Sequence, residues 1–147
     1  MLTIEHKQQE AESRTVEAPE LKPGLPLHFT SGVLGFEANK DFELISDEEL
    51  SPYQWLKGVD ADQSFLVIPP SFAVEKYSVE LADDDVVMLD LNNQTDAVVL
   101  CIATYHPNES VTINLKGPIV YNQKTLRGRQ IVPMNAADLS LAHPMGN

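Results

Sequence analysis

The sequence predicts an all-β fold, a small antiparallel β-barrel-like domain with one or two short helical turns. Its 147 residues suit a single domain, and a hydrophobic share of 43% is enough to form a core. Segments in which every second residue is apolar recur along the chain, as expected of strands exposed on one face. Glycine and proline separate these segments at fairly even intervals, which is typical of a barrel or a sandwich.

The folded body is expected to begin close to Leu25. Residues 1–23 contain eight charges and almost no apolar periodicity, so we interpret them as a mobile N-terminal arm or an edge element. Pro23, Gly24 and Pro26 then interrupt the chain before the first strand pattern. We assign residues 24–135 to the barrel-like domain and residues 136–147 to a C-terminal tail.

Two classes of strand follow. Alternating segments, exposed on one face, are predicted at 27–29, 77–81 and 111–115. Continuous apolar runs, which suit central strands covered on both faces, lie at 65–68 and 98–102. Shorter candidates lie at 42–45, 119–121 and 130–132.

Helix is expected to be minor. Residues 46–49 have the spacing of a capping box, but Pro52 follows too soon for more than one or two turns. The acidic run 83–85 precedes Val86, Val87, Met88 and Leu89, a segment that suits a short helix or a strand nearly equally. Periodicity leaves that choice open.

The charge balance favours a basic partner. Lys and Arg total 10 against 22 Asp and Glu, a net charge of −12. Residues 37–96 alone carry 15 acidic and 3 basic side chains, so we expect an acidic face. Direct binding of nucleic acid or of an anionic membrane is disfavoured, because both require clustered cations. Solubility is the alternative explanation of the acidic residues.

No catalytic, metal or cofactor site is expected. His28, His106, Asp60 and Asp62 lack the spacing of recognised metal ligands, and no nucleophile or phosphate-binding motif occurs. The single cysteine, Cys101, lies in an apolar run and is expected to be buried and inert. Trp55 is expected in the core. Without disulfides, a signal sequence or a long apolar segment, the cytoplasm is the expected location.

Four segments, with a short fifth match after the last of them, resemble in order motifs of the flagellar assembly factor FliW family. Residues 27–37 are similar to its opening strand and Gly-(Leu/Ile)-Pro-Gly-Phe, and 111–122 to its Thr-x-Asn-Leu-x-x-Pro-Ile-x-x-Asn. Between these two segments, residues 51–56 are similar to the family's Ser-Pro-Phe-x-x-Leu-Gln, and residues 64–69 are similar to its Ala-Phe-x-Val-x-x-Pro. After them, residues 130–132 are similar to its Gln-Val-Val. Leu34 stands where the family has proline, and Lys57 where it commonly has glutamine.

The resemblance implies a cytoplasmic β-barrel-like protein without enzymatic activity. It implies two partners, the RNA-binding translational repressor CsrA, which the protein would antagonise, and flagellin. It also favours a short helix at 83–89. We further expect a monomer when the protein is free.

The partner-binding residues are expected in three groups. They are Gly32, Gly35, Phe36 and Glu37; Asn114, Lys116, Pro118 and Asn122; and, for electrostatic attraction, Asp83, Asp84 and Asp85. Each has a structural alternative: unusual backbone angles for the glycines, core packing for Phe36, turn hydrogen bonds for the asparagines and helix capping for the aspartates.

Two other function classes stay open. A small β-barrel enzyme or ligand-binding module would hold a pocket in the barrel mouth, with His28, His106 and an aspartate converging on one point. A structural subunit of an assembly would expose a large apolar patch.

Overall fold

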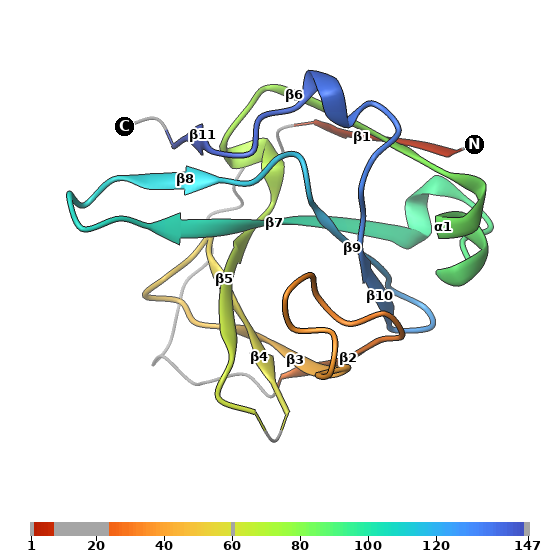
Figure 1. Cartoon of the computed structure of the whole chain (residues 1–147), viewed down its shortest axis with the longest axis horizontal. Coiled ribbons are helices and arrows are strands. Elements are labelled where there is room, and N and C mark those ends of the chain that lie inside the picture. Colours follow the sequence, from red (N-terminus) through yellow and green to blue (C-terminus); the bar gives the residue numbers. More distant parts are fainter. Residues whose placement is uncertain (1, 8–23, 60, 146–147) are drawn as a thin grey trace.

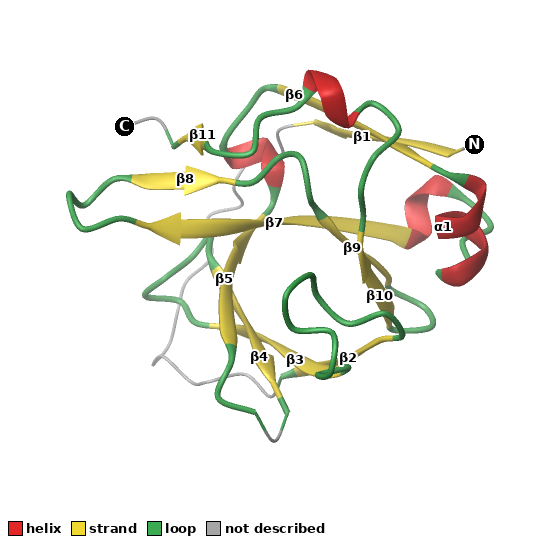
Figure 2. Cartoon of the chain, viewed as in Figure 1, coloured by secondary structure: helices red, strands yellow, loops and turns green. Residues whose placement is uncertain are grey.

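The computed structural model describes residues 2–7, 24–59 and 61–145, and strands dominate it (Figure 2). The strands are β1 (Leu2–Lys7), β2 (Leu25–Phe29), β3 (Asp41–Ser46), β4 (Gln54–Gly58), β5 (Ser64–Ile68), β6 (Lys76–Leu81), β7 (Ala97–Tyr105), β8 (Val111–Ile113), β9 (Ile119–Asn122), β10 (Arg127–Gln130) and β11 (His143–Pro144). The helical elements are α1 (Asp83–Met88) and the 3₁₀ helices η1 (Pro70–Phe72), η2 (Gln94–Asp96) and η3 (Ala136–Asp138).

The strands close into a barrel. Neighbours pair in the order β7, β5, β4, β3, β2, β10 and β9, and β9 pairs back with the first half of β7. Figure 1 shows these strands running around a ring, with the loop after β2 folded across it. All the pairs are antiparallel except β2 with β10. The predicted all-β, barrel-like fold is confirmed.

The period of two along β7 gives the protein two cores. Val99, Cys101 and Ala103 face an outer cluster, whereas Leu100 faces the barrel interior with Val98 and Ile102 packed beside it. Strand β5 divides its side chains in the same way. The continuous apolar runs at 65–68 and 98–102 are therefore strands covered on both faces, as predicted.

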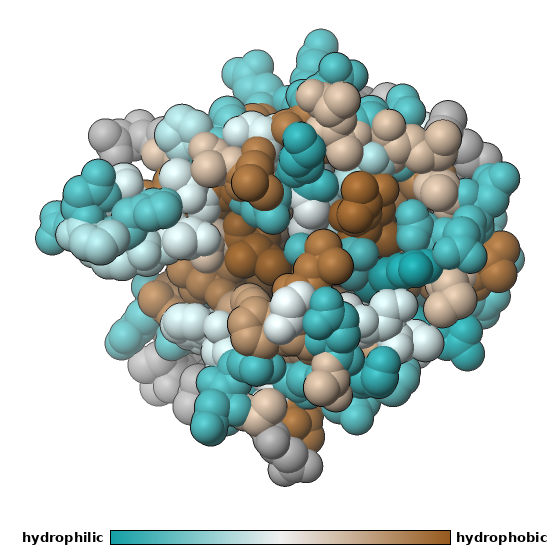
Figure 3. All heavy atoms as spheres, in the orientation of Figure 1, coloured by the Kyte–Doolittle hydropathy of each residue, from teal (hydrophilic) through white to brown (hydrophobic). Residues whose placement is uncertain are grey.

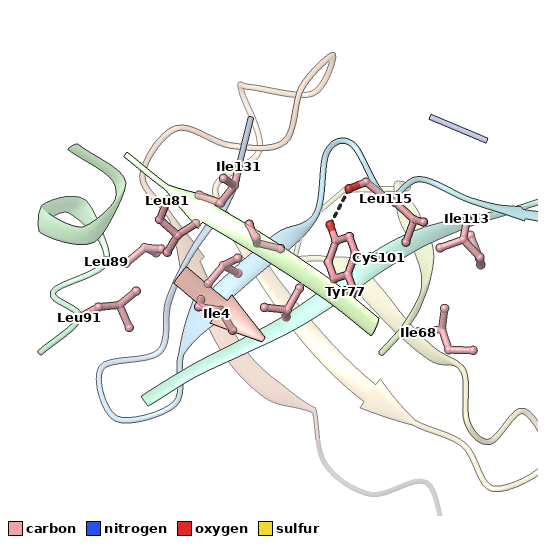
Figure 4. Packing of buried hydrophobic residues seen from close by; sticks show 14 residues of the cluster. Ile4, Ile68, Tyr77, Leu81, Leu89, Leu91, Cys101, Ile113, Leu115 and Ile131 are labelled. Carbon is pink, nitrogen blue, oxygen red and sulfur yellow. Dashed lines mark hydrogen bonds between the residues drawn. The ribbon is translucent and has the colours of Figure 1, made fainter. Parts of the chain in front are cut away.

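A small second sheet covers the outer cluster. Strands β1 and β6 pair antiparallel, with Ile4 opposite Val79, and both side chains are buried. The Tyr77 hydroxyl donates a hydrogen bond to the Leu115 carbonyl, which ties β6 to the chain after β8 (Figure 4). Residues 2–7 are thus an edge strand and not a mobile arm. The rest of the expected arm, residues 8–23, lies outside the described residues.

The C-terminal residues belong to the same fold. Strand β11 pairs with β8, and Leu139 and Met145 pack against the outer cluster. Residues 136–145 therefore continue the domain and do not form a separate tail.

Three local expectations need correction or a decision. Residues 83–88 form the helix α1, which settles the choice that periodicity left open. The capping-box spacing at 46–49 produces successive turns and no helix, because Ser46 ends β3 and its hydroxyl accepts from the Gln54 side chain. Trp55 is not in the core: on β4 it is 37% exposed, while Leu56 beside it points inward.

Candidate functional site

The loop at residues 32–37, here called the 32–37 loop, has a backbone that requires glycine. Gly32 has φ +69°, and a Cβ there would lie 2.6 Å from Glu37 Cα. The Gly32 amide donates to the Phe29 carbonyl, and the Phe36 amide donates to the Val33 carbonyl. Because Val33 is buried, the base of this loop is part of the core, and its tip is turned outward.

The tip of the loop is closed by its own acidic residue. The Gly35 amide donates to Glu37 Oε1 over 3.0 Å, and this bond lowers the pKa of the Glu37 carboxyl. Gly35 has φ +88°, with nothing within 4 Å of an added Cβ. It therefore supplies a backbone angle and leaves open space around the tip.

Aromatic packing attaches the loop to the barrel interior. The Phe36 ring meets the Phe65 ring edge to face at 5.3 Å, and Phe65 in turn packs against Phe42. Phe36 remains 38% exposed, and the neighbouring Leu34 is 60% exposed. The loop thus presents two apolar side chains on a held backbone.

The second predicted group is a turn at residues 114–117, here called the 114–117 turn. Asn114 Oδ1 accepts the amides of Lys116 and Gly117, at 3.0 and 2.9 Å. This side-chain turn ends β8 at Ile113, two residues before the predicted end of the strand. Lys116 is exposed at its tip.

Two predicted members of this group point inward. Pro118 is buried. Asn122 is 1% exposed; its Nδ2 donates to the carbonyls of Leu89 and Asp90, and its Oδ1 accepts the amides of Lys124 and Thr125. Asn122 therefore satisfies backbone groups, the structural alternative, and offers no side-chain atom to a partner in this conformation.

Gln130 joins the loop to the turn. Its Oε1 accepts the Leu34 amide at 2.9 Å, and its Nε2 donates to the Gly117 carbonyl at 3.0 Å. The two groups, about 80 residues apart in the sequence, therefore lie side by side. We call the exposed residues Leu34, Gly35, Phe36, Glu37 and Lys116, with Gln130 between them, the joint surface. Figure 3 shows apolar side chains gathered over the end of the barrel, with hydrophilic ones around them.

Sequence reasoning missed Gln130 as a site residue. It entered only as the first residue of the motif at 130–132, which was read as a strand. Strand β10 instead ends at Gln130. No local sequence signal indicates this role, because Leu34, 96 residues away, comes beside Gln130 only in the folded barrel.

The aspartates of the third group differ in their surroundings. Asp83 and Asp84 are exposed, whereas Asp85 is buried. Arg129 Nη1 lies 3.2 Å from Asp85 and 3.3 Å from Asp84. Burial raises the pKa of Asp85, and Arg129 opposes that shift. Asp85 is therefore an internal ion-pair partner, and Asp83 and Asp84 are the exposed charges of α1.

A cavity lies beside the 32–37 loop but does not assemble a catalytic group. It has a volume of about 750 Å³ and is lined by Phe36, Lys40, Asp41 and His28, among others. His28 Nδ1 is 2.8 Å from Asp41 Oδ1. His106 is not in this lining and instead bonds to the Thr112 hydroxyl in the β7–β8 hairpin. His28 and an aspartate therefore meet at this cavity, but His106 does not join them.

Cys101 is fully buried, as predicted, and burial raises the pKa of its thiol to about 12. Among residues 2–7, 24–59 and 61–145, no three His, Cys, Asp or Glu side chains cluster as metal ligands. In the same part of the chain, no helix has the length and apolarity to cross a membrane.

Comparison with known proteins places this architecture among proteins of one family. A family model described as FliW protein matches residues 7–145. The flagellar assembly factor FliW of Borrelia turicatae (strain 91E135) is 34% identical over 113 residues, which cover 76% of this chain and 86% of the relative. That of Leptospira interrogans serogroup Icterohaemorrhagiae serovar copenhageni is 36% identical over 113 residues, covering 74% and 75%. A crystal structure of the flagellar assembly factor FliW superposes with a TM-score of 0.76 at 27% identity, covering 83% of this chain and 86% of the other.

Proposed function

The chain belongs to the FliW family, and from this premise we propose that it is a cytoplasmic flagellar assembly factor that binds and antagonises the translational repressor CsrA. We propose that it also binds flagellin, so that the flagellin level controls how much repressor is free. In this role the protein acts by binding and performs no catalysis.

The joint surface is the observation that carries this proposal. Exposed Leu34 and Phe36 stand on a loop whose backbone is held by Val33, Glu37 and Gln130. Apolar and aromatic side chains on a preorganised backbone bind with a small entropy cost, and such residues dominate the affinity of protein interfaces. The surface is therefore suited to docking a folded partner.

The net charge supports a basic partner. A repressor that binds RNA must present positive charge to phosphates, and a protein with a net charge of −12 attracts such a surface. Asp83 and Asp84 are exposed on α1 and suit this role, whereas Asp85 is buried beside Arg129. Charge accelerates encounter, and the joint surface supplies affinity.

Titration calorimetry with purified CsrA-type repressor tests the proposal. We expect a saturable complex at low salt that weakens as salt increases. Phe36→Ala should lower the affinity at least about tenfold, since a buried aromatic anchor contributes more than about 1.4 kcal/mol. The matched control is Phe72→Ala, because Phe72 is also a partly exposed phenylalanine, at 44%, but lies on η1.

Several outcomes would contradict the proposal. Absence of heat and of co-elution with both the repressor and flagellin at low salt would remove it. Equal losses for Phe36→Ala and Phe72→Ala would remove the joint surface as the docking site.

Flagellin added to the complex should release the repressor, as size-exclusion chromatography would show.

A further inference from the structure

We propose that Gln130 is a positioning residue, which holds the 32–37 loop against the 114–117 turn so that a partner meets both as one surface. The inference rests on the proposed function for its partner. It adds a residue that acts through the groups it positions, which are the exposed side chains of the 32–37 loop and of the 114–117 turn.

The backbone at Gln130 is held firmly in the barrel wall. Its backbone lies opposite Ile119 in the β9–β10 pair, and the next amide, Ile131, donates to the Pro118 carbonyl. Ile119 and Ile131 are both completely buried. A side chain that leaves such a backbone has its position fixed by the barrel wall.

The side-chain amide of Gln130 forms two hydrogen bonds, one as acceptor and one as donor. The carbonyl oxygen accepts from Leu34 in the loop, and the nitrogen donates to Gly117 in the turn. Since a carboxylate offers only acceptors and a hydrocarbon offers neither group, only glutamine among side chains of this shape serves both partners. The bridge therefore depends on the chemistry of the residue as well as its size.

The turn is shaped to receive this side chain. A Cβ at Gly117 would lie 3.1 Å from Gln130 Nε2 and 3.2 Å from Asn114 Nδ2. These separations are tighter than most contacts of a real Cβ, so glycine opens the space that Gln130 fills. Asn114 fixes the amides of Lys116 and Gly117 and thereby orients the carbonyl that accepts from Gln130.

The loop tip depends on this bridge for its attachment to β10. Among the described residues, the other hydrogen bonds of the tip run from Gly35 to Glu37, from Phe36 to Val33 and from Asn39 to Phe36. None of them reaches β10. Phe36 anchors one side on Phe65, and Gln130 anchors the other at the Leu34 amide. Without Gln130, the tip would sample several positions, and only one of them would fit the partner. The apparent affinity would then be reduced in proportion to the fraction of molecules whose tip is in that position.

The first test uses the free protein and amide hydrogen exchange at Leu34, measured by NMR. Gln130→Leu removes both hydrogen bonds and shortens the side chain by one carbon, and exchange at Leu34 should become at least about fivefold faster. Gln130→Glu keeps the acceptor for Leu34 and loses the donor for Gly117, so protection of Leu34 should persist. Unchanged exchange in Gln130→Leu would overturn the positioning role, whatever the protein binds.

The second test measures binding of the repressor by calorimetry. Gln130→Leu and Gln130→Glu should each lower the affinity at least about fivefold, because each separates the loop from the turn. In a Leu34→Ala, Phe36→Ala, Lys116→Ala background, Gln130→Leu should cause less than about a twofold further loss, since the side chains that it positions are gone. An equal loss in both backgrounds would mean that Gln130 does not act through them, and would overturn the proposal.

Urea unfolding of each variant separates positioning from general stability. An effect on affinity that scales with loss of stability, and that Gln130→Glu does not share, would assign Gln130 a structural role only. If the wild-type chain binds neither repressor nor flagellin, the proposed function fails, and the exchange result alone decides whether Gln130 holds the loop.

Discussion

Gly128→Ala examines a close contact between backbone and aromatic ring in the barrel wall. Gly128 lies opposite Phe29 in the parallel β2–β10 pair, and a Cβ there would approach Phe29 Cε1, Cζ and Cδ1 to 2.5, 2.8 and 3.0 Å. Phe29 is completely buried and packs on Phe42 at a ring separation of 5.1 Å. The ring therefore has no free direction in which to retreat.

The expected cost follows from this geometry. Real Cβ atoms essentially never approach closer than 3.0 Å, so β10 or the Phe29 ring must move by several tenths of an ångström. Overpacking of this kind costs about 1–3 kcal/mol, and the reduced freedom of the unfolded chain returns about 0.5 kcal/mol. We expect a net loss of about 1.5 kcal/mol, or about 5 °C in Tm for a domain of this size.

Urea unfolding followed by the fluorescence of Trp55, the single tryptophan, measures the loss. Adding Phe29→Leu should recover at least about 1 kcal/mol relative to the sum of the single changes, because leucine removes the ring atoms that clash. Additive effects of the two changes would refute the steric argument.

Gly35→Ala is the matched control. It has a positive φ and no neighbour within 4 Å of a Cβ, so it should cost about 1–2 kcal/mol through backbone strain alone. Its effect should be additive with Phe29→Leu. Coupling between the two would indicate that both glycine variants perturb the barrel in the same general way.

Three further outcomes are expected. Burial raises the pKa of Asp85 above the ordinary 3.8, so the folded state binds the proton of this carboxyl more tightly than the unfolded chain does. The stability that this proton contributes is present at low pH and is lost as pH rises through the pKa of the folded state. Asp85→Asn should therefore gain in unfolding free energy relative to wild type as pH rises above 3.8; a constant difference in urea titrations across pH would contradict this. Cys101, with a pKa of about 12, should resist a thiol reagent in the native protein and react once urea unfolds it, and rapid native labelling would refute its burial. Asn122→Ala should lower the unfolding free energy by at least about 2 kcal/mol in urea titrations, since buried backbone groups lose their partners, whereas a near-neutral change would return Asn122 to the list of contact residues.

The local pattern of apolar and polar residues predicted structure well where a single physical rule decides which side chains are buried. The run at 98–102 identified a strand covered on both faces, because only such a strand has apolar side chains at every position. The pattern failed at Trp55, since an aromatic residue on a strand suits either face of a sheet and only the pairing register selects one. At 46–49 the pattern limited any helix to one or two turns, and the structure has turns there in which the Asp47 side chain accepts the Glu49 amide.

The amino-acid sequence by itself determined the class of fold, the strand segments, the buried thiol and, through its motifs, the family, because each of these depends on neighbours in the chain. Only the tertiary structure decided which predicted site residues share a surface. It brought Leu34 and Gly117 to the two ends of Gln130 and turned Asn122 and Asp85 inward. The physical reason is that the Leu34–Gln130 hydrogen bond, between residues 96 positions apart, depends on barrel closure, which no local pattern encodes.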